Sequence, residues 1–217
     1  MNNKNLLTLL GIPALILILV IFSVDKNFDT TRNPEEVLNT SQTTEKTNVP
    51  PPTERVDPTK SYTAVIKTTK GNMTIELYSL ETQVAVTNFV YLSRLGFYNG
   101  TIFHRIVNNF MIQGGDPLGN GTGGPGYNFS DEEITKDYER GIVAMANSGP
   151  NTNGSQFFIV HKDQPDLPKN YVIFGKVIDG LDVLDAIAES EVTQSPGGET
   201  SLPIEPVIIN SVEILET

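Results

Sequence analysis

The sequence FHRIVNNFMIQGGD, at residues 103–116, predicts two short strands joined by a turn. The strands are expected at 102–107 and 110–114, and the polar pair Asn108-Asn109 lies between them. Short strands that meet at a polar turn are typical of an antiparallel hairpin. The sequence therefore predicts a hairpin near the middle of the chain.

The side chains of this hairpin are unusual for an exposed surface. Because side chains alternate along a strand, Met111 and Gln113 share one face, whereas Ile112 points the opposite way. An arginine, Arg105, and an aromatic residue, Phe110, are expected on the same surface as Met111 and Gln113. Two interpretations fit the hairpin alone: a core hairpin with one solvated arginine, or a hairpin that carries a functional site.

Further motifs give the chain a resemblance to a known family. Residues 144–159 read AMANSGPNTNGSQFFI, residues 120–124 read NGTGG, and residues 174–177 read FGKV. Together with the hairpin, these motifs closely resemble the cyclophilin family of peptidyl-prolyl cis–trans isomerases, in the family's order and at its spacing. The resemblance runs from about residue 62 to residue 215.

The rest of the chain predicts a mainly β fold. Apolar residues recur at helical spacing over 82–95, which ends before Gly96, and 181–189 is expected to form a second, short helix. Many short strands with two helices indicate a capped antiparallel barrel. The resemblance implies the same: a closed eight-stranded antiparallel β-barrel capped by two α-helices. Besides the hairpin, strands are expected at 62–69, 73–78, 141–146, 156–160, 171–177 and 207–215.

The resemblance also implies the site residues. Arg105 is the candidate catalytic residue, and an apolar pocket would hold the proline ring. Gln113 would bind the carbonyl region of the substrate, while main-chain groups of Ala146 and Asn147 would hold its extended backbone. Ordinary core packing is the alternative for each aromatic side chain. The substrate-binding set is Phe110, Met111, Gln113, Ala146, Asn147, Gln156, Phe158, Leu167 and Tyr171.

The chemistry of prolyl isomerisation suits an arginine. Resonance gives the X–Pro amide a rotational barrier of about 18–20 kcal/mol. At the twisted transition state the prolyl nitrogen regains its lone pair, and a guanidinium on that nitrogen bonds it only in this state. A gain of about 7 kcal/mol would accelerate rotation roughly 10⁵-fold. The permanently charged, rigid donor fork of Arg105 suits this task better than lysine would, and no cofactor or metal is required.

The expected function is therefore prolyl isomerisation that assists the folding of exported proteins. Its partners would be proline-containing peptides and unfolded protein clients, and the domain is expected to be monomeric. The competing interpretation is a chaperone that binds proline peptides and isomerises them only incidentally. The chain departs from many family members in lacking tryptophan, with Asp166 before Leu167 and Tyr171 in place of a histidine. These differences predict weak binding of cyclosporin, and a short loop between residues 113 and 141 resembles bacterial members.

The N-terminal region predicts a membrane anchor. Residues 5–24 carry no charged side chain, and twenty helical residues cover about 30 Å, the hydrocarbon thickness of a bilayer. We interpret residues 1–24 as a transmembrane anchor with the domain on the extracytoplasmic side. The alternatives are a cleaved signal peptide, for which residues 21–24 offer a poor cleavage site, and an inverted anchor with a cytosolic domain.

The following segment, 25–60, is polar and is predicted to be a disordered, flexible linker, stiffened by prolines at 50–52. The isomerase domain is expected at 61–217.

Composition excludes other classes of function. The formal net charge is −11, so nucleic acid is not an expected partner. There is no cysteine, which excludes disulfides and thiolate metal sites. The glycine pattern at 119–124 is followed by Pro125-Gly126 and no helix, unlike a dinucleotide site. The two histidines, His104 and His161, lack metal-ligand spacing, and His104 is interpreted as a hydrogen-bonded strand residue beside the site.

Overall fold

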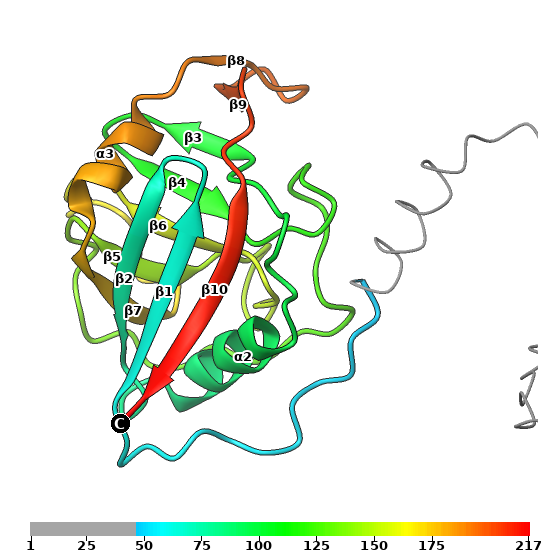
Figure 1. Cartoon of the computed structure of the whole chain (residues 1–217), viewed down its shortest axis with the longest axis vertical. Coiled ribbons are helices and arrows are strands. Elements are labelled where there is room, and N and C mark those ends of the chain that lie inside the picture. Colours follow the sequence, from blue (N-terminus) through cyan, green and yellow to red (C-terminus); the bar gives the residue numbers. More distant parts are fainter. Residues whose placement is uncertain (1–46) are drawn as a thin grey trace, which may run out of the picture.

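The computed structural model describes residues 47–217 as a curled sheet with two helices against it (Figure 1). The predicted anchor at 1–24 and the linker as far as residue 46 lie outside the described residues. Neither helix within 47–217 has the length and apolar character needed to cross a bilayer. The elements are β1 (Tyr62–Thr68), β2 (Gly71–Leu77), α2 (Gln83–Arg94), β3 (Arg105–Val107), β4 (Met111–Gly114), β5 (Ile142–Met145), β6 (Phe157–Val160), β7 (Ile173–Asp179), α3 (Leu181–Ala188), β8 (Val192–Gln194), β9 (Thr200–Pro203) and β10 (Ile209–Glu216).

The main sheet has eight antiparallel strands, but it is not the closed barrel that was predicted. Its order is β10-β1-β2-β7-β5-β6-β4-β3, so β10 and β3 are its two edges. β3 is only three residues long, and Ile102, just before it, makes isolated bridges rather than a ladder. Single hydrogen bonds such as Phe103 N to Val207 O, at 3.0 Å, span the gap between the edges. The sheet is therefore a curled half-barrel.

Alternation along the strands separates two apolar clusters. Ile106, Ile112, Ile159 and Val143 are paired in register across β3, β4, β6 and β5, and they belong to the larger cluster inside the curl. Their apolar neighbours along each strand face outward and belong to or pack against a second, smaller cluster that includes Met111. The opposite directions predicted for Met111 and Ile112 are confirmed.

Helix α2 closes one side of the inner core. It buries Phe89, whose ring lies 5.1 Å from that of Tyr98 and 5.5 Å from that of Phe157. The helix has no side-chain cap of its own at Thr82; instead, the Glu132 carboxylate accepts hydrogen bonds from the first-turn N–H groups of residues 84 and 85, at 2.9 and 2.8 Å. A distant loop thus supplies the cap.

Residues 47–60, predicted to be part of a disordered linker, instead lie against the domain. Figure 1 shows this segment running past α2 to the start of β1. Val49 and Val56 pack against the inner core, Val49 N donates to Pro125 O at 2.8 Å, and Val56 N donates to Thr87 Oγ1 at 3.1 Å. Two valines and these backbone hydrogen bonds hold the polar segment against the domain. We call residues 47–60 the N-terminal strap.

A hairpin that the sequence did not predict lies beside the sheet edge. Strands β8 and β9 form a separate two-stranded sheet, and β9 lies next to β3 (Figure 1). Most of β8 is exposed and its polar sequence lacks strand alternation, which is why the pattern predicted no strand there.

Candidate active site

The outward face of the sheet brings the predicted site residues into one row. Arg105 on β3 pairs with Gln113 on β4, Gln113 pairs with Phe158 on β6, and Phe158 pairs with Ala144 on β5. Directly paired residues point to the same face of a sheet. Cross-strand register therefore places an arginine, a glutamine and an aromatic ring side by side.

The apolar residues of the outward-facing cluster lie next to this row, and we call the surface that they form the apolar slot. Met111 and Phe158 belong to it and are 1% and 5% exposed. The ring of Tyr171 stands edge-on to Phe158 with centroids 5.4 Å apart, and Phe110 and Leu167 are partly buried against the same cluster. The structure thus brings together all five predicted apolar residues of the proline pocket and its rim.

Arg105 lies at the rim of the slot. Its Cζ is 5.6 Å from the centre of the Phe110 ring, and Nη1 is 3.6 Å from Met111 Sδ and 3.5 Å from Gln113 Oε1. Its Nε and Nη2 pair with the Glu199 carboxylate at 2.7 and 2.8 Å. The Arg105 side chain is about one-third exposed. The Nε and Nη2 edge of the guanidinium is therefore occupied by Glu199, while Nη1 faces the slot.

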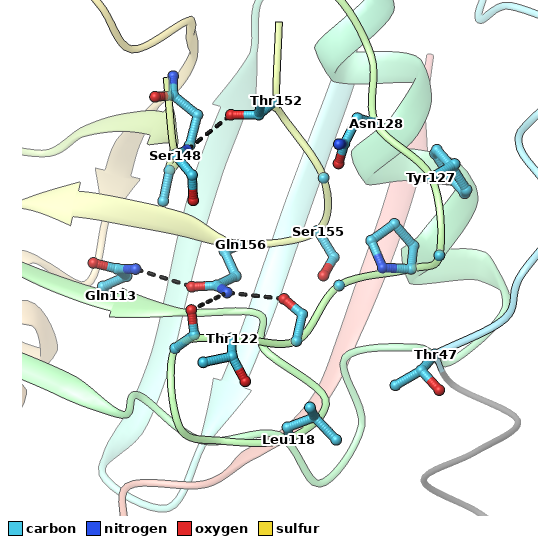
Figure 2. Close-up of a pocket in the computed structure, with 18 residues that line it drawn as sticks. Thr47, Gln113, Leu118, Thr122, Tyr127, Asn128, Ser148, Thr152, Ser155 and Gln156 are labelled. Carbon is cyan, nitrogen blue, oxygen red and sulfur yellow. Dashed lines mark hydrogen bonds between the residues drawn. The ribbon is translucent and has the colours of Figure 1, made fainter. Parts of the chain in front are cut away.

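A chain of amides fixes the polar side of the site (Figure 2). Gln113 Nε2 donates to Gln156 Oε1 at 3.0 Å, and Gln156 Nε2 donates to Gly121 O at 3.0 Å and to Gly123 O at 2.8 Å. The Gln156 amide is oriented by the two glycine carbonyls, so Gln113 must offer its N–H₂ to Gln156. Gln113 Oε1 is consequently left facing Arg105.

A cavity of about 750 Å³ opens beside these amides (Figure 2). Gln113, Gln156, Ala146 and Asn147 line it, together with the glycine loop and Thr47 of the N-terminal strap. Ala146 also packs against the apolar cluster, so the cavity adjoins the apolar slot. Ala146 N donates to Gln156 O at 3.0 Å, which holds this backbone in place.

The loop whose carbonyls orient Gln156 is held by Asp116, a residue that the sequence interpretation missed. Asp116 is fully buried, and its carboxylate accepts hydrogen bonds from the N–H groups of Leu118, Asn120 and Gly121, at 2.8, 3.0 and 2.5 Å. A Cβ on Gly123 would stand 2.0 Å from Asp116 Oδ1, so only glycine fits there. An aspartate followed by a glycine-rich loop could have suggested this role.

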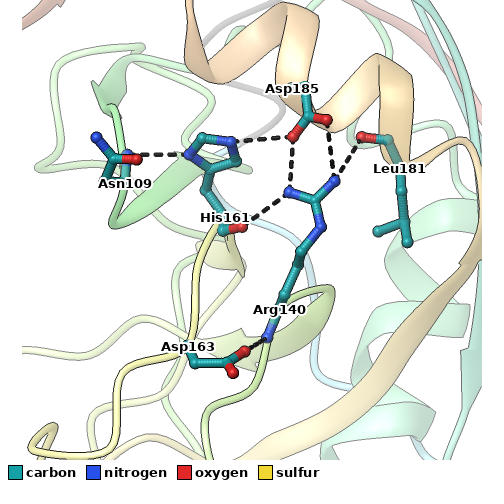
Figure 3. A network of polar contacts seen from close by, with 6 residues as sticks. All are labelled: Asn109, Arg140, His161, Asp163, Leu181 and Asp185. Carbon is teal, nitrogen blue, oxygen red and sulfur yellow. Dashed lines mark hydrogen bonds and ion pairs between the residues drawn. The ribbon is translucent and has the colours of Figure 1, made fainter.

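The turn of the β3–β4 hairpin is tied to α3 by a polar network (Figure 3). Asn109, with a φ of 62°, donates its N–H to His161 Nδ1 at 2.9 Å, and His161 Nε2 lies 3.0 Å from Asp185 Oδ1. Arg140 grips the same carboxylate with Nη1 and Nη2 at 2.6 and 3.0 Å. The hydrogen bond from Arg140 is the main reason that the pKa of Asp185 is lowered. This network anchors the residue that precedes Phe110.

His104 does not have the hydrogen bonds that were expected of it. It is 7% exposed, and neither ring nitrogen has a hydrogen-bond partner among the described residues. Burial is the main cause that lowers the pKa of His104 below its ordinary 6.5; the Asp116 carboxylate opposes this shift, and Arg105 adds to it. The ring is therefore neutral in the folded protein at neutral pH.

We expect the free energy of unfolding to decrease as the pH falls below about 6.5, because unfolded His104 binds a proton there and the folded ring does not. The decrease from this one group is at most about 1.4 kcal/mol per pH unit, and it ends at the lowered, folded-state pKa. Urea unfolding between about pH 7.5 and pH 5 measures it. The variant His104→Gln should flatten the curve, and an unchanged slope would contradict the assignment.

Within residues 47–217, acidic and histidine side chains form no group of three that could hold a metal ion.

Comparison with known proteins identifies the class. The family model described as cyclophilin type peptidyl-prolyl cis-trans isomerase/CLD matches residues 63–214. Peptidyl-prolyl cis-trans isomerase-like 3 of Gallus gallus is 45% identical over 154 residues, 69% of this chain and 93% of that protein. A peptidyl-prolyl cis-trans isomerase of Helicobacter pylori is 43% identical over 147 residues, 66% of this chain and 90% of that protein.

Solved structures agree. A cyclophilin type isomerase of Cryptosporidium parvum matches with a TM-score of 0.66 and 39% identity, over 72% of this chain and 99% of that one. The same Cryptosporidium protein in the presence of the dipeptide Ala-Pro matches with a TM-score of 0.65 and 40% identity, over 71% of this chain and 99% of that one. The chain belongs to the cyclophilin family, and it is a peptidyl-prolyl cis–trans isomerase.

Proposed function

We propose that Arg105 is the catalytic residue of this isomerase. The observation that carries the proposal is the position of Nη1, which faces the apolar slot beside Met111 Sδ and Gln113 Oε1. A proline ring in the slot would place its nitrogen next to this donor. When the amide twists, the nitrogen gains a lone pair that can accept a hydrogen bond from Nη1, whereas the planar amide offers none. The guanidinium therefore binds the transition state more tightly than the substrate.

The other site residues hold the substrate on either side of the rotating bond. Phe110, Met111, Phe158 and Leu167 enclose the proline ring, with Tyr171 packed edge-on against Phe158. The residues before the proline extend along Ala146 and Asn147 into the adjoining cavity, where the amides of Gln113 and Gln156 contact the backbone of the peptide.

A fixed ring and a held backbone confine the motion to the X–Pro bond. The direct test is whether isomerisation of an X–Pro peptide by the full chain depends on Arg105.

We further propose that the domain is held by an N-terminal anchor outside the cytoplasmic membrane, where it assists the folding of exported chains. Support comes from the uncharged apolar run at residues 5–24. Because X–Pro isomerisation takes tens to hundreds of seconds unassisted, newly exported chains are suitable clients.

Protease treatment of intact cells that express the tagged full chain tests this location. We expect membrane-bound protein whose domain is cleaved without permeabilisation, while a cytoplasmic marker is protected. Cleavage only after permeabilisation would support the inverted anchor, and recovery of a shortened protein in the medium would support a cleaved signal peptide. Either result would overturn the proposed location. The monomeric state and weak cyclosporin binding stay predictions.

A further inference from the structure

The β8–β9 hairpin brings a second charged group to the active site. Glu199 lies just before β9, and its two carboxylate oxygens each accept one hydrogen bond from Arg105, at 2.7 Å from Nε and 2.8 Å from Nη2. Two parallel, charge-assisted bonds fix both the position and the plane of a guanidinium. They also occupy the edge of the fork that faces away from the slot. Nη1, the group aimed at the substrate, is left outside this pairing.

Arg105 needs such a partner because of where it lies. β3 is an edge strand of three residues, so β4 is its only neighbour in the main sheet. The contacts from Nη1 to Gln113 Oε1 and Met111 Sδ, at 3.5 and 3.6 Å, are long and weak. An arginine side chain has many rotamers, and weak contacts on one side do not select among them. The carboxylate supplies the missing constraint.

Glu199 is itself held firmly. Its backbone carbonyl accepts a hydrogen bond from Ser195 N at 2.7 Å, which closes the turn of the hairpin, and Gly198 has the positive φ of 86° that this turn requires. Hydrogen bonding from Arg105 is the main cause that lowers the pKa of Glu199 to about 2, and Ser201, which is 2% exposed, adds to it. The carboxylate therefore stays charged throughout the range in which the enzyme can be assayed.

We propose that Glu199 is a positioning residue for catalysis: it clamps Nε and Nη2 of Arg105 so that Nη1 points at the prolyl nitrogen. This inference depends on the catalytic role proposed for Arg105. Because the pair is partly exposed, its loss should change the stability of the fold little. Its loss should instead lower the fraction of molecules in which Nη1 has the productive orientation, which affects the transition state more than the bound ground state.

The test compares Glu199→Ala, Glu199→Gln and Glu199→Asp in the full chain with a proline test peptide. We expect the alanine and glutamine variants to lose about three- to thirty-fold in kcat with KM within about twofold. Aspartate keeps the charge and both oxygens on a shorter stem, so it should recover part of the loss. Glu205→Gln, at an exposed residue just after β9, is the matched control for removal of one negative charge and should behave as wild type.

Two further readouts separate positioning from a structural role. The Nε–H resonance of Arg105 in an NMR spectrum should be sharp and protected from exchange in the wild type, and broadened or absent in Glu199→Ala. In the double variant Arg105→Ala/Glu199→Ala, removal of the carboxylate should have no further effect on kcat.

Wild-type kcat in Glu199→Ala would overturn the inference, as would a higher kcat, since the carboxylate would then act as a brake. A kcat loss that persists undiminished in the Arg105→Ala background would also overturn it. The catalytic role of Arg105 fails separately, if Arg105→Ala alone keeps wild-type turnover.

Discussion

Replacing Arg105 by alanine is expected to lower kcat/KM for an X–Pro test peptide at least tenfold while the fold survives. A tenfold loss corresponds to about 1.4 kcal/mol of transition-state stabilisation, which is less than one charge-assisted hydrogen bond in a desolvated site can supply. The fold should survive because the Arg105 side chain is about one-third exposed and its partner Glu199 lies at the surface. Isomerisation of the peptide by the full chain, followed by peptide NMR exchange or a coupled protease assay, measures the change.

Two variants make this result interpretable. Arg105→Lys keeps the positive charge but loses the planar fork, so it should recover little of the activity. Arg94→Ala removes another exposed arginine, which lies at the end of α2 and pairs with Glu216 of β10 at 2.6 Å, and it should leave kcat/KM unchanged. If Arg105→Ala retained wild-type turnover, rotation would depend on the slot and the backbone contacts alone.

Replacing Asp116 by alanine should have the largest effect on stability. Three backbone N–H groups of the glycine loop would lose their acceptor, and a fully buried side chain would be removed. Unpaired donors of this kind cost about 1–3 kcal/mol each when buried, less where water can reach them, so we expect the free energy of unfolding to fall by about 2–5 kcal/mol. Isomerase activity should fall as well, because the carbonyls that orient Gln156 belong to this loop.

Urea denaturation measures the stability change, and two variants control for it. Asp116→Asn keeps one acceptor oxygen and should be intermediate. Asp137→Ala removes an aspartate that is 81% exposed and pairs only at the surface with Lys169, so its free energy of unfolding should stay within about 0.5 kcal/mol of wild type. Equal stabilities of Asp116→Ala and Asp137→Ala would show that the loop does not depend on Asp116.

The parts of the fold that the sequence predicted well are those determined by local patterns. Alternation alone placed Met111 and Ile112 on opposite faces, and helical spacing located α2 to within a residue at each end. The closed barrel was wrong because closure depends on whether one edge strand reaches the other, and no local pattern reports that β3 stops at three residues.

In the candidate site, too, the residues in local motifs were predicted, whereas those that act through tertiary contacts were not. Arg105, Gln113 and Phe158 lie in short motifs, and cross-strand register converts their spacing into a shared face. Glu199 could not be found, since it lies far along the chain from Arg105 in a polar segment whose residue types do not alternate between apolar and polar. Asp116 ends the hairpin motif, but its residue type alone does not indicate that its carboxylate holds the glycine loop. Tertiary contacts made by isolated polar residues leave no periodic signal in a sequence.

The N-terminal strap extends the folded domain beyond the residues that match the family model. Residues 47–60 lie ahead of the part that matches the family model, which starts at residue 63. Nevertheless, Thr47 forms one wall of the cavity beside Gln156, and Val56 bonds to α2. A recombinant version trimmed to the family boundary would lack Thr47 from the cavity lining, and it would lack the residues that pack on α2. Rates and peptide preferences measured on such a fragment should therefore differ from those of the chain that keeps residues 47–60.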